Sequence, residues 1–113
     1  MKVKTYEKNG VAVVEPSGKL MGGADTGELD EKLYALLGRG QHKVVLDLGR
    51  TDWMNSSGIA ILIHHWKKFN DAGGSLRLAN LTKKIEKIMI IAKLTTVFEV
   101  FDSLDEAVNS FGG

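Results

Sequence analysis

The fold is decided by the stretch Lys43-Val-Val-Leu-Asp-Leu48, which is followed by Gly49-Arg-Thr-Asp-Trp-Met54, Asn55-Ser-Ser-Gly58 and Ile59-Ala-Ile-Leu-Ile63. The first run is too apolar for a half-exposed strand and predicts a central one. We expect a short surface connection over residues 49–54 and a helix that begins at the serines. Asn and Ser are preferred at helix starts, because their side-chain oxygens accept hydrogen bonds from unpaired backbone N–H groups. The stretch therefore predicts two hydroxyls at the positive end of a helix.

Outward from this centre, strands and helices alternate. Asn9-Gly10 is a strong hairpin signal and joins strands over 2–8 and 11–14, with Pro16 and Gly18 ending the hairpin. Helical spacing of apolar residues predicts helices over about 29–37, 57–72, 82–93 and from Ser103, and short strands over 76–79 and 97–101. The pattern predicts a single α/β domain over residues 1–113, with a mixed, mostly parallel sheet of about five strands and about four helices.

Composition limits the function classes. Of 113 residues, 43% are apolar and 26% charged, which is typical of a soluble globular domain. The chain has no cysteine, which excludes disulfides, thiolate metal sites and cysteine nucleophiles. Its net charge of +1 gives no indication of a nucleic-acid or membrane partner. The polar N-terminus and the absence of a run of about 20 apolar residues lead us to expect a cytoplasmic protein without a membrane segment.

No pattern of residues indicates an enzyme. A nucleophile elbow needs glycine where Met54 stands, and a histidine later in the chain. His64 lies on the same predicted helix as Ser56, about 12 Å further along its axis. His64 and His65 diverge by about 100° on that helix, so they make a poor metal pair, and we expect both to be exposed to solvent. Gly22-Gly23 lacks the Lys-Ser/Thr of a phosphate-binding loop. We therefore expect no catalytic residue, no metal and no cofactor.

The serines retain two possible roles. One of the three polar residues at 55–57 caps the helix, which is a structural role worth about 1 kcal/mol. Alternatively, a serine accepts a phosphate, whose charge of about −2 would meet the positive end of the helix and leave the fold intact. Such a modification would repel an acidic partner or fill space that a partner needs.

Two segments carry more apolar residues than one buried stripe requires. They are Ile59-Ala-Ile-Leu-Ile63 and Met89-Ile90-Ile91. Either the core packs against both sides of these helices, or part of each forms an exposed protein-binding patch. Four lysines could rim such a patch or simply form a solvated face: Lys83, Lys84, Lys87 and Lys93.

The order of elements and several motifs resemble the STAS family, which includes the bacterial anti-sigma factor antagonists. The resemblance covers nearly the whole chain. Its motifs are Val44-Val-Leu-Asp-Leu48, Asn55-Ser-Ser-Gly58, Gly73-Gly74, Leu76-Arg-Leu78, Leu94-Thr-Thr-Val-Phe98 and Phe101-Asp-Ser-Leu-Asp-Glu-Ala107.

The resemblance implies a switch in transcription regulation. In that family the unphosphorylated antagonist binds an anti-sigma factor that is also a serine kinase, and so frees a sigma factor. The kinase phosphorylates a serine at the start of the second helix and the complex dissociates; a PP2C-type phosphatase can reset it. The family's acceptor corresponds to Ser56, and Ser57 is the lesser candidate. The domain would then be a phosphoprotein and a binding partner, not an enzyme.

The expected contact surface centres on the same place. Its residues are Asn55, Ser56, Ser57, Gly58, Ile59, Ile61, Gly22 and Gly23. Two positions depart from the family: Asn55 replaces an Asp beside the acceptor, and Met21 replaces an acid often found after the second strand. The alternative function is a non-switching STAS scaffold, or an accessory subunit of a stress-signalling or transporter complex.

Overall fold

The computed structural model describes residues 1–112, except for the side chain of Asp25. The elements follow in the order β1 (Lys2–Lys8), β2 (Val11–Leu20), a 3₁₀ turn η1 (Gly23–Thr26), α1 (Gly27–Gly38), β3 (Lys43–Asp47), β4 (Thr51–Met54), α2 (Ser56–Asp71), β5 (Ser75–Ala79), α3 (Lys83–Ile91), β6 (Val100–Phe101) and α4 (Leu104–Asn109). This confirms an α/β domain with four helices.

The sheet has six strands, with the row β1-β2-β3-β5-β6 and β4 paired to β2 outside that row. Only β1 and β2 are antiparallel, and every other pair is parallel, so the expected mixed, mostly parallel sheet is confirmed. The hairpin turns at Asn9-Gly10, where both residues have positive φ, as a type I′ turn requires. The apolar run at 43–47 forms the central strand β3, as predicted.

Three expectations about the strands were wrong. The strand expected over 97–101 comprises only Val100–Phe101 (β6), because the N–H groups of residues 97 and 98 bond back to the Leu94 carbonyl oxygen in a turn. Pro16 and Gly18 do not end the second strand, because β2 continues to Leu20 and pairs with β4 through its last residues. Residues 51–54 are that strand, not a surface connection. The Thr51 hydroxyl, fully buried, donates to the Pro16 carbonyl oxygen at 3.1 Å and fixes β4 against β2. A strand of four residues with only its two end residues buried gives little periodic signal.

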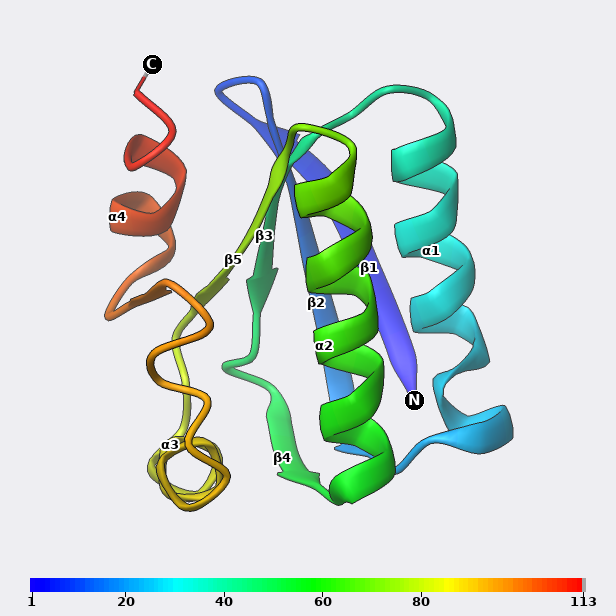
Figure 1. Cartoon of the computed structure of the whole chain (residues 1–113), viewed down its shortest axis with the longest axis vertical. Helices are drawn as coiled ribbons and strands as arrows, with labels where there is room; N and C mark the ends of the chain where they lie inside the picture. The colour runs from blue at the N-terminus through cyan, green and yellow to red at the C-terminus, as the bar shows by residue number, and fades with distance from the viewer. Residues whose placement is uncertain (113) are drawn as a thin grey trace.

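Helices cover both faces of the sheet. In Figure 1, α1 and α2 lie side by side over one face of the sheet. The helix α4 lies beside β5 and packs against the opposite face. The larger core lies under the first pair and includes Leu29, Leu33, Leu46, Leu62 and Phe69. A smaller core under α4 joins Val13 and Val45 to Ala107 and Val108. The central strands are therefore buried on both faces, as their composition predicts.

The prediction that His64 and His65 are both exposed was wrong for His65. Its side chain is only 1% exposed, and its Nε2 lies 2.6 Å from Oδ1 of Asp30 on α1. The helix α1 packs against α2 beside His65, so the His65 ring is shielded from solvent. Burial lowers the pKa of His65, and Asp30 opposes part of that effect. His64 is exposed and contacts the Tyr34 hydroxyl.

Candidate functional site

The serine segment forms the first turn of α2. Asn55 is the residue before the helix, and its Oδ1 accepts a hydrogen bond from the Gly58 backbone N–H at 2.9 Å. Asn55 therefore supplies the cap that the sequence assigned to one of three residues. Ser56 and Ser57 are both exposed, and neither hydroxyl makes a hydrogen bond to the part of the chain that the structure describes, which leaves out the Asp25 side chain. Capping thus leaves both hydroxyls available at the positive end of the helix.

Gly58 fixes this turn against the sheet. A Cβ at this position would overlap the backbone oxygen of Leu20, the last residue of β2. The same oxygen accepts a hydrogen bond from the Asn55 backbone N–H at 3.3 Å. Only glycine allows the helix start to approach β2 so closely, and this approach positions the serines at the carboxyl ends of β2 and β4.

The loop that contains Gly22 lies against the second serine. A Cβ at Gly22 would lie 2.6 Å from the Ser57 Cβ, which is closer than atoms can pack. Gly22 also has a φ of +83°, a conformation that favours glycine. The predicted loop and helix start are therefore in contact through Gly22 and Ser57, while Gly23 is exposed with open space around it.

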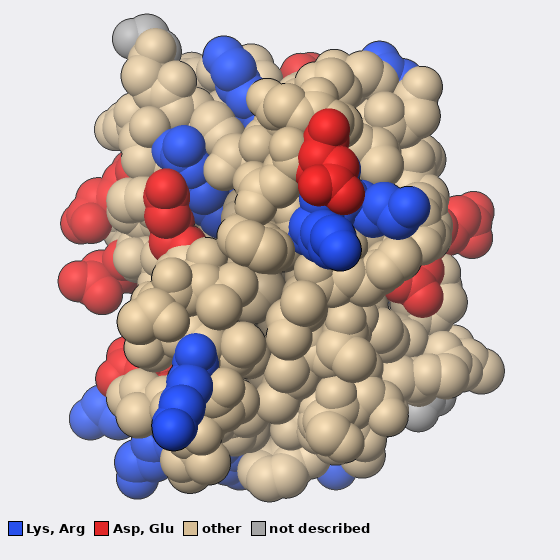
Figure 2. Space-filling model, viewed as in Figure 1, with Lys and Arg blue, Asp and Glu red and all other residues tan. Residues whose placement is uncertain are grey.

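Ser56 borders an apolar cavity of about 280 Å³, which neither Gly22 nor Ser57 lines. We call this the Ser56 groove; its lining residues are Trp53, Met54, Asn55, Ser56, Ile59, Ile88, Ile91 and Ala92. Ile91 is 81% exposed and Trp53 is 40% exposed, so the groove opens to solvent. The Lys84 ammonium lies 5.8 Å from the centre of the Trp53 ring, at the edge of the groove. In the view of Figure 2, the surface in the lower middle of the molecule is uncharged, and lysine or arginine side chains lie to its left, over α3.

The structure separates the two isoleucines that the sequence placed on one contact surface. Ile59 lines the Ser56 groove, whereas Ile61, half-buried, is not among its lining residues. Two residues along a helix differ by about 200°, so these side chains leave α2 in nearly opposite directions. Ile61 therefore belongs to a different flank of α2 from the groove.

Sequence reasoning did not include Trp53 or Ile88 among the site residues. Trp53 lies on β4, which was predicted to be a surface connection, and Ile88 is a partly buried residue of α3 packed against the core. The exposed Ile90 and Ile91 do match the apolar excess noted on α3, and this favours an exposed patch over a core packed on two sides. A large aromatic residue directly before a predicted helix start was the available signal for Trp53.

Among the described side chains of residues 1–112, which leave out Asp25, no three histidine, aspartate or glutamate residues gather where they could share a metal ion. No helix in the described part of the chain is long and apolar enough to cross a membrane.

Residues 2–107 match the STAS domain. The chain belongs to the STAS family. BtrV of Bordetella bronchiseptica, named as a candidate anti-sigma factor antagonist, is 30% identical over 88 residues, which cover 78% of this chain and 76% of BtrV.

Solved STAS structures share the fold. The crystal structure of a candidate anti-sigma factor antagonist from Thermotoga maritima superposes with a TM-score of 0.84 at 19% identity, covering 96% of this chain and 92% of that one. The phosphorylated form of SpoIIAA, a Bacillus cell fate determinant, superposes with a TM-score of 0.75 at 15% identity, covering 97% and 99% of the two chains. The names of the two antagonist relatives describe regulatory proteins.

Proposed function

We propose that this STAS domain is a cytoplasmic anti-sigma factor antagonist whose unphosphorylated form binds an anti-sigma factor with serine kinase activity. Phosphorylation of Ser56 by that partner ends the binding, and a PP2C-type phosphatase restores it. Through this cycle the domain regulates sigma-factor-dependent transcription. The observation that carries the proposal is the position of the exposed Ser56 side chain on the wall of an open apolar groove.

The groove is a suitable surface for a protein partner. Exposed apolar clusters on a soluble domain mark interaction sites, and aromatic residues are enriched at their centres. Here Trp53, Ile59 and Ile91 come from three different elements, so the surface exists only in the folded domain. A partner that covers Trp53 and Ile91 must also cover Ser56, because all three line the same groove.

A phosphate on Ser56 would weaken that contact without unfolding the domain. The phosphate would meet the positive end of α2, which favours an anion, so the helix start would tolerate it. A partner that buries the groove would have to remove water from a group of charge about −2, and this costs binding free energy. The same modification is therefore compatible with the fold and unfavourable for the complex.

Ser56 is a better acceptor than Ser57. The Ser57 Cβ lies against Gly22, so a phosphate there would stand beside the loop before α1. Ser56 lines the groove, and its hydroxyl makes no hydrogen bond to the described part of the chain, the Asp25 side chain excepted. A kinase bound at the groove would reach Ser56 without moving the backbone.

Asn55 adjusts the rate of the switch. It supplies the cap as an aspartate would, but it lacks the negative charge that the family carries beside the acceptor. Loss of this charge weakens the local attraction for the Mg²⁺ that accompanies ATP in a kinase site. We therefore expect slow phosphorylation at Ser56, with partner binding intact.

The relatives support the proposal at two points. BtrV is named as a candidate anti-sigma factor antagonist. SpoIIAA, which has the same fold, has been solved in a phosphorylated form.

The test is incubation of the domain with Mg²⁺-ATP and a kinase-type anti-sigma factor from the same organism, followed by mass spectrometry. Phosphate on Ser56 that is lost in Ser56→Ala and kept in Ser57→Ala supports the switch. If neither serine gains phosphate while the complex forms, the switch is excluded and a scaffold role remains.

A further inference from the structure

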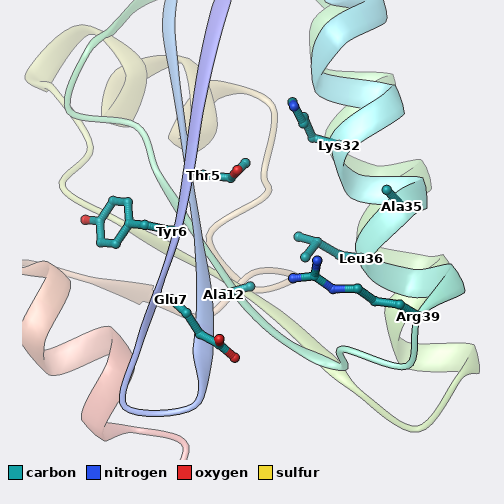
Figure 3. Close-up of a pocket in the computed structure, with 8 residues that line it drawn as sticks. All are labelled: Thr5, Tyr6, Glu7, Ala12, Lys32, Ala35, Leu36 and Arg39. Atoms are coloured by element: carbon teal, nitrogen blue, oxygen red, sulfur yellow. The ribbon is translucent and has the colours of Figure 1, made fainter.

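A second cavity lies far from the serines in the sequence, between β1 and α1. Its volume is about 310 Å³, within the range of small-molecule sites. Its walls are the second half of β1 and the C-terminal half of α1, with Ala12 of β2 at the back (Figure 3). We call this the β1–α1 cavity.

Three side chains with hydrogen-bond donors turn toward this cavity. Figure 3 shows Lys32 and Arg39 extending from α1 toward the strands, and Thr5 extending from β1 toward α1. Lys32 and Leu36 on α1 and Arg39 just after it are spaced at i, i+4 and i+7, which places them on one stripe. Among the side chains that the structure describes, which leave out Asp25, none of the three donors has a hydrogen-bond or ion-pair partner.

The orientation of Arg39 is informative. Arg39 directly follows the last residue of α1, where a cation could turn toward the free carbonyl groups of the helix end. Instead, in Figure 3 its guanidinium extends back beside Leu36 toward β2. The charge therefore lies over the cavity.

The floor of the cavity is apolar and small. Leu36 and Ala12 are buried at the floor, and Ala35, which is exposed, lines the cavity at its rim. Ala12 pairs with Glu7 across the hairpin, and its short side chain leaves space in front of the sheet. The carboxylate in the lining, Glu7, accepts a hydrogen bond from Gln41 at 3.2 Å, and Tyr6 turns to the other side of β1 (Figure 3).

We propose that the β1–α1 cavity binds a small organic anion, with its carboxylate or phosphate between Lys32 and Arg39 and its apolar body on Ala12, Ala35 and Leu36. The two cations exceed the single carboxylate of the lining, so the cavity favours a ligand with a negative group. The Thr5 hydroxyl donates a further hydrogen bond to that group. This site is separate from the Ser56 groove and shares no lining residue with it.

The test uses naphthalene-1-carboxylate as the probe, titrated into the full ¹⁵N-labelled chain and followed by NMR. A ligand of this size is expected to bind with a Kd of about 1 mM. Saturable shifts should appear at residues 5–7, 12 and 32–39. Naphthalene-1-methanol, which has the same rings without the charge, should bind at least about tenfold more weakly. A third titration uses 1-naphthyl phosphate. Whichever of the phosphate and the carboxylate probe has the lower Kd indicates the anionic group that the cavity prefers.

Two substitutions and a control separate the proposal from general binding to a positive surface. Lys32→Gln and Arg39→Gln should each raise the Kd of the carboxylate probe at least about fivefold and leave that of the alcohol unchanged. Lys68→Gln, an exposed position on α2, should change neither. Equal affinity for the charged and neutral probes, shifts centred elsewhere, or no saturation would overturn the proposal.

Discussion

The cap at Asn55 gives a prediction whose size follows from the structure. In Asn55→Ala the Gly58 N–H loses its 2.9 Å hydrogen bond to the side chain, and a lost cap of this type costs about 1 kcal/mol. With an unfolding entropy of about 2.1 cal/mol/K per residue, 113 residues give about 0.24 kcal/mol/K. The melting temperature should therefore fall by about 4 °C, measured by differential scanning calorimetry.

Asn55→Asp is the matched comparison. It keeps an oxygen for the cap and adds a negative charge at the helix start, which stabilises by about 0.3–1 kcal/mol. Its melting temperature should rise by about 1–4 °C, and its Ser56 should be phosphorylated faster because the family's acid is restored. Ser103→Ala, which removes the cap of α4, controls for cap loss away from the site. An unchanged melting temperature in Asn55→Ala, or equal decreases in both Asn55 variants, would refute the capping argument.

Three further predictions follow. Gly58→Ala should lower the free energy of unfolding by about 2 kcal/mol in urea titrations, because the added Cβ meets the Leu20 oxygen. Gly27→Ala adds a Cβ in open space and should not lower it. Equal effects of the two substitutions would contradict the close approach of α2 to β2. His65 has a lowered pKa in the fold, so its stabilising contribution is complete above its unfolded pKa of about 6.5 and declines as the pH falls below it. Urea titrations at several pH values should show a smaller loss of stability in His65→Gln than in the unmodified chain, and identical pH profiles would contradict this. Trp53→Ala should raise the Kd for the anti-sigma factor at least about tenfold with little change in stability. Tyr6→Ala removes an exposed aromatic residue elsewhere and should leave this Kd unchanged. Calorimetric titration measures the Kd of both variants, and equal changes would contradict binding at the groove.

The sequence was sufficient for most of the architecture. The apolar run at 43–47 correctly indicated a central strand, and Asn9-Gly10 correctly indicated a hairpin. Both were strong signals, because a central strand and a type I′ turn tolerate few other sequence patterns. The last helix was predicted to begin at Ser103, and the Ser103 side chain accepts a hydrogen bond from the Glu106 N–H at 3.1 Å as the cap of that helix. Local signals of this kind depend only on neighbouring residues, so a single sequence reveals them.

The sequence was insufficient where distant segments meet. The strand β4 pairs with the distant strand β2, and the Thr51 hydroxyl bonds to Pro16 across 35 positions; no local pattern indicates either contact. His65 is buried because α1 packs beside α2. Trp53, Ile59 and Ile91 form one groove only when β4, α2 and α3 are folded together. The sequence thus indicated the serines, Ile59 and the apolar excess at 89–91, whereas the structure was needed to join them with Trp53 in one groove.

The proposed switch requires that a phosphate on Ser56 ends partner binding at the groove. The most direct measurement is a calorimetric titration of the cognate anti-sigma factor with the unmodified chain and with the chain carrying phosphoserine at position 56. Calorimetric unfolding of both forms establishes that each is folded. The account predicts that the phosphate raises the Kd by at least about tenfold, or about 1.4 kcal/mol, with the fold intact. Equal affinity of the two folded forms for the anti-sigma factor would contradict it.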